Sequence, residues 1–163
     1  MNESSLGRIY QHIQQKNVNS WAIFSSNRTD NSPSKNHKDF IELKGKIRGY
    51  DLGFIELIGY GQEEDKLGNI ETTYEKSLFV PGIKQKQVIK LCNIYNQLGY
   101  IYCGDETDNK IVLFLNGKED KILNNFVPNK IADFYSILKG KTFVFEDVVP
   151  STYMEKYYKY FRR

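Results

Sequence analysis

The spacing of apolar residues along the chain predicts where helices form. Apolar side chains at i, i+3, i+4 and i+7 give a helix one buried stripe, and this spacing predicts helices over about residues 4–16, 84–97 and 131–140. Another helix is predicted after Ser34, a favourable N-cap residue. A last helix is predicted over 151–162, where a capping box marks its start. The predicted buried stripes include Phe40, Leu43 and Ile47 in the second helix and Val88, Leu91, Cys92 and Tyr95 in the third.

Runs of β-branched and aromatic residues predict the strands. The runs at 53–60 and 72–80 are separated by an acidic polar turn, so we expect them to pair as an antiparallel hairpin. The run at 111–115 is apolar at every position, which predicts burial on both faces. The other predicted strands cover residues 20–26, 100–103, 121–126 and 142–148.

The order of these elements predicts an α+β fold. Helices interleaved with hairpins indicate a single mixed, mostly antiparallel sheet with helices packed on it, an α/β sandwich. The hairpins interrupt the strand–helix–strand alternation that a doubly wound nucleotide-binding fold requires. No long linker divides the chain, so residues 1–163 are expected to form one domain. Its core is predicted at 20–148, with the helices 4–16 and 151–162 at the periphery.

Composition narrows the classes of protein. With 163 residues, of which 40% are hydrophobic, the chain can bury a sizeable core. It contains no apolar run long enough to span a membrane, and its N-terminal residues lack the features of a signal peptide, so a cytoplasmic location is expected. The net charge of +3 is too small to indicate nucleic acid from bulk electrostatics alone. Nucleic acid is therefore not an expected partner unless basic residues cluster locally.

Signatures of metal sites and of common enzymes are missing from the sequence. Cys92, Cys103, His12 and His37 lack the spacing of a zinc site, and core positions are favoured for both cysteines. The sequence contains no Gly-rich phosphate loop, no GxSxG and no HExxH motif. No catalytic residue, metal ligand or cofactor is therefore assigned, and the sequence leans against an enzyme without settling the question.

The candidate ligand site lies at the end of the first predicted strand. The strand 20–26 ends in Ser25 and Ser26 and is followed directly by Asn27 and Arg28. A rigid strand that ends in polar residues can aim them at a ligand. Arg28 offers a planar fork of donors that fits a carboxylate or a phosphate. Alternatively, these residues form a solvated loop that caps the next helix.

Polar residues from later segments are candidates for the same site. Alternation along the strand 72–80 puts Glu75 and Ser77 on one face, where Glu75 could form a charged cleft with Arg28. The alternative is that this face is solvated. The amide of Gln97 could also reach this cleft, although capping of its helix end is the favoured role. The remaining candidate ligand-binding residues are Asn36 behind the loop, Gln97 at a helix end, and Tyr60 and Tyr100, whose rings could stack on a ligand.

The C-terminal stretch 153–163 mixes aromatic and basic side chains. Single-stranded nucleic acid is bound by such mixtures, because bases stack on the rings and phosphates meet the cations. A partner protein could also bind there, and a peripheral helix uses the same residues to pack an aromatic stripe with a solvated rim. Packing is the favoured interpretation.

Five short stretches follow one another in a recognisable order: SSNR at 25–28, Asn36, GFIELIGY at 53–60, EKSLFV at 75–80 and NQLGYIY at 96–102. This order resembles that of a loosely defined family of small bacterial and phage domains of unknown function. The resemblance covers about residues 20–115. It implies that Arg28, Glu75, Ser77 and Gln97 converge in one cleft. It also implies a phage or mobile-element origin, with the host cytoplasm as the location.

The sequence leads to three functional hypotheses. The leading one is a non-enzymatic, phage- or mobile-element-type accessory protein that binds a small anionic, nucleotide-like ligand as a sequestering or host-modulating factor. The second is an inhibitor or adaptor that binds a host protein through the C-terminal helix or the acidic loop 61–71. The third is a nucleotide-directed hydrolase or transferase with Glu75 as general base. The sequence is also compatible with a homo-oligomer.

Overall fold

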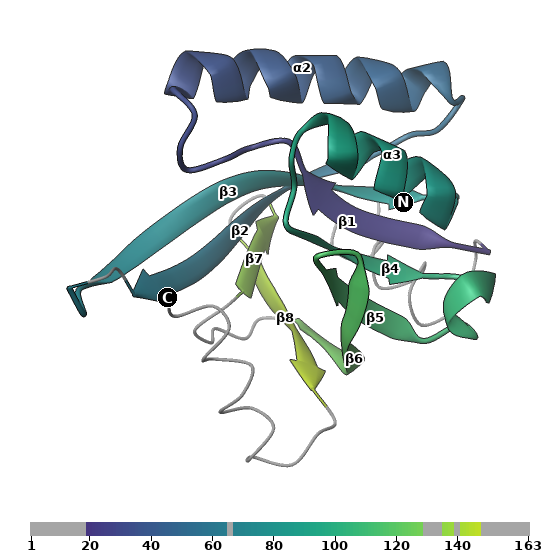
Figure 1. The fold of residues 1–163 in the computed structure, drawn as a ribbon. Coiled ribbons are helices and arrows are strands. Elements are labelled where there is room, and N and C mark those ends of the chain that lie inside the picture. Colours follow the sequence, from purple (N-terminus) through teal and green to yellow (C-terminus); the bar gives the residue numbers. More distant parts are fainter. Residues whose placement is uncertain (1–18, 65–66, 129–134, 139–140, 148–163) are drawn as a thin grey trace.

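The computed structural model describes residues 19–64, 67–128, 135–138 and 141–147. Among these residues, two α-helices interrupt the series of strands (Figure 1). In chain order the elements are β1 (Trp21–Ser25), α2 (Pro33–Gly49), β2 (Ile55–Glu64), β3 (Ile70–Pro81), α3 (Gln85–Ile94), β4 (Gly99–Cys103), the 3₁₀ turn η1 (Asp105–Thr107), β5 (Ile111–Leu115), β6 (Lys118–Pro128), β7 (Tyr135–Leu138) and β8 (Lys141–Asp147).

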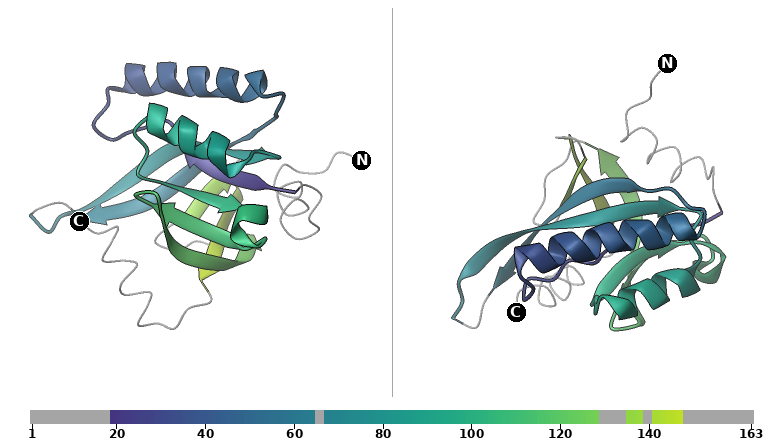
Figure 2. Two further views of the ribbon diagram at one scale, coloured as in Figure 1. Left: turned by 45° about the vertical axis from the view of Figure 1, so that its right-hand side comes forward. Right: turned by 90° about the horizontal axis from the view of Figure 1, so that it is seen from above.

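The eight strands form one sheet that closes on itself in the order β1-β3-β2-β7-β8-β6-β5-β4. Every pairing among the described strands is antiparallel. β1 closes the ring, because Trp21 lies opposite Pro81 of β3 on one side and opposite Cys103 of β4 on the other. Both helices lie on the same side of the sheet (Figure 2). The predicted α+β fold, with helices packed on an antiparallel sheet, is confirmed, and the closure of the sheet is an additional feature.

The sheet separates two apolar clusters, which explains why β1 is buried at every position. Ala22 and Phe24 face the helices and pack with residues of α2, α3, β3, β4 and β5. Trp21 and Ile23 point to the other side, where the Trp21 ring stacks on Phe79 with 5.2 Å between ring centroids. β5 is buried along its whole length in the same way, so the predicted burial of both its faces is confirmed.

The helices bury the faces that their spacing predicts. Phe40, Leu43 and Ile47 of α2 are buried, and so are the four predicted residues of α3 and its C-cap, Val88, Leu91, Cys92 and Tyr95. Burial raises the pKa of the Cys92 thiol to about 12, which fits a core cysteine. Neither of these helices combines the length and the apolar character needed to cross a membrane.

The start of α2 differs from the prediction. The N-cap is Ser32, whose hydroxyl accepts a hydrogen bond from the Lys35 amide at 3.1 Å, and not Ser34. Pro33 explains the shift, because proline has no amide hydrogen and its fixed φ suits the first helical position. The helix therefore begins directly behind the polar turn that follows β1.

The predicted hairpin between β2 and β3 is confirmed, and it is longer than predicted. Pairing runs from Ile55 opposite Phe79 to Glu64 opposite Ile70, so residues 61–64, predicted as turn, are strand. In both views of Figure 2 this hairpin extends beyond the neighbouring strands. β6 is also longer than the predicted 121–126.

The helix predicted over 131–140 is wrong where the structure describes it, since Tyr135–Leu138 form the strand β7. β7 pairs with β2 through Ser136 opposite Gly59, and with β8 through Ile137 opposite Thr142. Two neighbouring strands that offer backbone partners outweigh an apolar spacing that fits one helical face. The predicted helices 4–16 and 151–162 lie outside the described residues.

Candidate ligand site at the β1 tip

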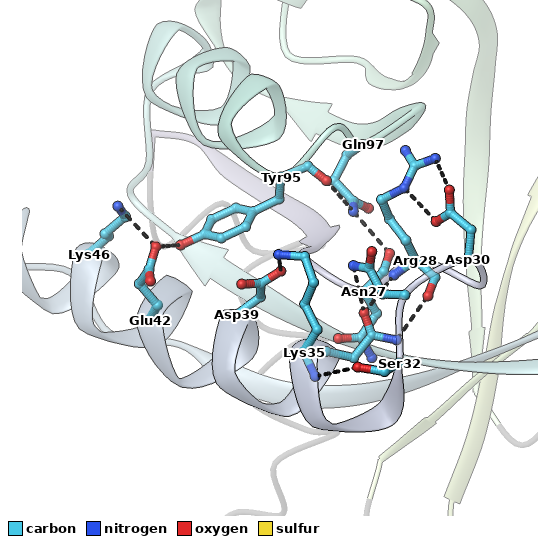
Figure 3. Close-up of polar contacts among 12 residues, drawn as sticks. Asn27, Arg28, Asp30, Ser32, Lys35, Asp39, Glu42, Lys46, Tyr95 and Gln97 are labelled. Carbon is cyan, nitrogen blue, oxygen red and sulfur yellow. Dashed lines mark hydrogen bonds and ion pairs between the residues drawn. The ribbon is translucent and has the colours of Figure 1, made fainter.

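β1 ends at Ser25, and the chain then turns through residues 26–32 into α2. This turn, with the polar residues that hold it, forms the candidate site and is called the β1-tip site. It lies between the first turn of α2 and the end of α3 (Figure 3). The residues of the β1-tip site are Ser25, Ser26, Asn27, Arg28, Asp30, Asn36, Asn96 and Gln97.

Side chains distant in sequence hold the backbone of the turn. Asn36 Oδ1 accepts from the Arg28 amide at 3.0 Å, and Asn36 Nδ2 donates to the Arg28 carbonyl at 2.9 Å. Gln97 Nε2 donates to the Asn27 carbonyl at 2.9 Å across 70 positions of sequence. The Asn27 amide in turn donates to Ser25 Oγ at 2.9 Å. The turn is therefore fixed by hydrogen bonds to the backbone of two successive residues, Asn27 and Arg28.

The guanidinium of Arg28 lies at the surface in a two-point contact with Asp30. Nε and Nη2 each donate to one carboxylate oxygen of Asp30 at 2.8 Å (Figure 3). Nη1 donates to the Asn96 carbonyl. The side chains of Arg28 and Asp30 are 38% and 64% exposed. The hydrogen bond and the charge of Asp30 raise the pKa of Arg28, and the hydrogen bond from Arg28 lowers the pKa of Asp30. The ion pair thus stays charged at both ends in neutral solution.

Two buried oxygen atoms beside Arg28 have no hydrogen-bond partner among the described residues. They are Oγ of Ser26, a residue with 0% exposure, and Oδ1 of Asn27. Most buried polar atoms in proteins are hydrogen-bonded, and leaving one unpaired carries an energetic cost. Two such atoms lie at adjacent positions of this turn.

Contacts between α2 and the residues that follow α3 hold these two segments together beside the turn. The Tyr95 hydroxyl donates to Glu42 Oε1 at 3.0 Å, and Lys46 forms an ion pair with the same carboxylate at 3.4 Å. The hydrogen bonds from Tyr95 and from Lys46 hold the pKa of Glu42 below its usual value. α2 is thereby linked to the residues that follow α3, two positions before Gln97.

The structure brings together only part of the predicted site. Ser25, Ser26, Asn27, Arg28, Asn36 and Gln97 lie in the β1-tip site, and Ser77 is opposite Ser25 in the register of β1 and β3. Glu75 lies two residues before Ser77 in β3 and is exposed. The carboxylate that holds Arg28 is that of Asp30. The cleft implied between Arg28 and Glu75 thus stays a prediction.

Of the two tyrosines predicted to stack on a ligand, only Tyr100 has a side chain that the structure describes. Tyr100 is a core residue whose ring stacks on Phe114 at 4.9 Å between centroids and whose hydroxyl accepts from Gln85 Nε2 at 3.2 Å. Its ring is therefore already covered on the face that meets Phe114. Tyr60 belongs to β2, opposite Tyr74, and its side chain lies outside what the structure describes.

Sequence reasoning missed Asp30 and the Asn96 carbonyl as partners of Arg28. Asp30 could have been found from the Arg-x-Asp spacing, which lets a carboxylate reach back to a guanidinium two residues earlier. The Asn96 carbonyl gives no such signal, because a backbone group 68 positions away carries no residue type. Within the described residues, no group of His, Cys, Asp and Glu side chains is placed to hold a metal ion.

The sequence matches no protein-family model, and no curated protein was found to match it. The chemistry of the β1-tip site therefore has to be inferred from its own residues.

Proposed function

We propose that the domain binds a small anionic, nucleotide-like ligand at the β1-tip site, with Arg28 as the anion contact. The observation that carries the proposal is the two-point contact between the exposed guanidinium and the carboxylate of Asp30. A phosphate or carboxylate group of a ligand can take the place of Asp30, because it accepts two parallel hydrogen bonds from the same fork.

Exchange of Asp30 for a ligand is favoured by the exposure of the pair. Asp30 is 64% exposed, and surface ion pairs contribute little to stability. The Arg28 backbone stays in place during the exchange, since it is held by Asn36 and not by Asp30. The guanidinium is therefore positioned for a ligand before the ligand arrives, which lowers the entropic cost of binding.

The first turn of α2 adds favourable electrostatics. It contains no acidic residue, and Asn36, which is bound to the Arg28 backbone, belongs to it. The N-terminal end of a helix carries partial positive charge on its free amide groups. An anion held by Arg28 therefore lies close to a second source of positive potential.

The unpaired oxygens favour a ligand that also carries hydrogen-bond donors. Oδ1 of Asn27 can only accept, so its partner must be an N–H or O–H group. A nucleotide supplies such groups from its base and ribose in addition to its phosphate, whereas inorganic phosphate lacks the base and the sugar. The atom is buried, so binding of a donor to it requires the turn to rearrange. An accessory protein that binds such a ligand without converting it would act by sequestering it.

Isothermal titration calorimetry with AMP and with inorganic phosphate tests the proposal. Arg28→Ala should abolish AMP binding, and Asp30→Asn should tighten it, because the internal competitor for the fork is removed. Glu56→Gln is the matched control for Asp30→Asn, since Glu56 is an exposed carboxylate that accepts from Lys44 at 2.8 Å in another ion pair. AMP should bind more tightly than phosphate.

The opposite responses of Arg28 and Asp30 are the decisive feature. If the wild-type protein binds neither AMP nor phosphate, or if Arg28→Ala binds AMP as well as the wild type, the proposal is wrong. If Asp30→Asn and Glu56→Gln tighten AMP binding equally, the effect comes from the overall charge of the protein, and the proposal is also wrong.

A further inference from the structure

The two helices hold a positive charge that the whole chain does not show. With the N-cap residue Lys84 they carry eight basic and two acidic side chains, a local net charge of +6, whereas the chain has +3. The rest of the molecule is therefore net negative. These charged residues, called the helix layer, are Lys35, Lys38, Lys44, Lys46, Arg48, Lys84, Lys86 and Lys90, with Asp39 and Glu42.

The helix layer forms one face of the molecule. α2 and α3 lie side by side on the same side of the sheet, as seen from above in Figure 2, and pack against one shared apolar cluster. Their outward positions therefore point in a common direction, away from the sheet. Lys38, Lys86 and Lys90 occupy such positions and are exposed. α2 alone has 17 residues and so extends over roughly 25 Å.

Much of this charge is not neutralised by acidic partners. Three lysines of the layer form ion pairs, with Asp39, Glu42 and Glu56. Lys38, Lys84, Lys86 and Lys90 form no ion pair with any residue in the part of the chain that the structure describes. A field of one sign over a broad face attracts a ligand with many charges of the opposite sign.

We propose that the helix layer binds the phosphate backbone of a nucleic-acid duplex. Lysine suits this role, because its ammonium group acts as a point charge on phosphate and needs no particular geometry. Protein interfaces, by contrast, are depleted in lysine and enriched in aromatic residues and methionine. The residues of α2 and α3 include no exposed Phe, Tyr, Trp or Met.

The lack of exposed Phe, Tyr and Trp side chains also favours a duplex over a single strand as the ligand. Proteins that hold single strands stack bases on exposed aromatic rings, and Phe40, the one Phe, Tyr or Trp of these two helices, is buried. Contact with phosphates alone is independent of sequence. The local clustering of charge thus reverses the expectation that bulk charge gave for nucleic acid.

Fluorescence anisotropy with short duplexes of random sequence, one of DNA and one of RNA, tests the proposal on the full chain. The test variant is Lys38→Glu with Lys86→Glu. Lys86→Glu is compatible with the helix, because it puts a carboxylate in the first turn of α3 and four residues before Lys90. The matched control is Lys110→Glu with Lys118→Glu, which changes the net charge equally at exposed positions outside the layer.

We expect the wild type to bind with an affinity that falls steeply with salt. The test variant should bind on the order of tenfold or more weakly at about 50 mM salt, and its log–log salt slope should be shallower by about 2. The control should keep most of the wild-type affinity. Binding of either duplex supports the proposal. The duplex that binds more tightly shows whether the preferred phosphate backbone is that of DNA or of RNA.

Three results would overturn the proposal. The first is no duplex binding by the wild type at low salt, and the second is an equal loss of affinity in test and control variants. The third is binding to vesicles of anionic phospholipid with no binding to either duplex, which would make the helix layer a membrane-contact surface. Circular dichroism of both variants checks that each remains folded.

Discussion

The side chain of Asn36 pairs with the main chain of Arg28 through both of its polar atoms, accepting from the amide at 3.0 Å and donating to the carbonyl at 2.9 Å. This is the hydrogen-bond pattern that a neighbouring strand would supply, provided here by one side chain where β1 has ended. A residue in the first turn of α2 therefore determines the backbone position of the proposed anion contact.

Replacement of Asn36 should destabilise the protein and not only the turn. Asn36→Asp keeps an acceptor for the Arg28 amide but places a second acceptor against the Arg28 carbonyl. We expect the free energy of unfolding to fall by about 1–3 kcal/mol, as for other buried groups left without a partner. Urea denaturation measures this change. Asn93→Asp, at an exposed position of α3, is the control and should have little effect; equal losses in the two variants would contradict the role given to Asn36.

Two glycines should respond to alanine with opposite signs. At Gly45, in α2, a Cβ would meet no atom within 4 Å, so Gly45→Ala should stabilise the protein by about 0.5–1 kcal/mol through the lower entropy of the unfolded chain. At Gly99 a Cβ would lie 2.5 Å from Leu115 Cδ2 and 2.6 Å from the Phe114 carbonyl oxygen. That carbonyl belongs to the strand paired with β4 and cannot easily move.

We therefore expect Gly99→Ala to cost about 1–3 kcal/mol, the range for overpacked cores. Thermal unfolding of the two single variants and of the wild type gives both signs in one experiment. A stabilising Gly99→Ala would mean that β4 and β5 are further apart than the structure places them.

Local patterns in the sequence predicted most elements because those elements bury one face or two. The stripe of Phe40, Leu43 and Ile47 identifies α2, and the apolar run at 111–115 identifies β5, since in each the spacing of side chains reflects the packing directly. The residue pattern of segment 135–138 does not indicate a single type of secondary structure. Its spacing fits a helical face, and its backbone partners in β2 and β8 lie far away in the sequence. Closure of the sheet through β1 and β4 depends likewise on pairing that no local pattern contains.

The proposed site was predictable only in its residue types. A strand that runs into Ser25–Arg28 is visible in the sequence, and Gln97 and Asn36 were expected near it. Their contacts here are with the backbone of the turn, so part of their hydrogen-bonding capacity holds the loop. The local net charge of the helix layer was not evident from the composition for a different reason. The net charge of the chain is the sum of the basic helix layer and the rest of the chain, which is net negative.

Two buried tyrosines should make the protein sensitive to alkaline pH. Tyr95 and Tyr102 are 6% and 0% exposed, and their hydroxyls donate to Glu42 and Glu106, each at 3.0 Å. Burial, followed by the hydrogen bond to a carboxylate, raises the pKa of both phenols. Burial alone would raise the pKa of Glu106 as well, but hydrogen bonds from the Glu106 and Gln85 amides and from Tyr102 lower it.

The sign of the pH dependence follows from these shifts. In the unfolded chain both phenols ionise near pH 10, whereas in the folded protein they stay protonated to higher pH. Their contribution to stability is therefore complete below about pH 10 and is lost as the pH rises from there through the folded pKa, by up to roughly 1.4 kcal/mol per pH unit for each phenol. Urea denaturation at a series of pH values between about 8 and 11 measures this slope. Tyr95→Phe should make the slope shallower, and Tyr74→Phe, at a side chain that is 63% exposed, is the matched control. Equal slopes for the wild type and Tyr95→Phe would show that Tyr95 ionises alike in the folded and unfolded states.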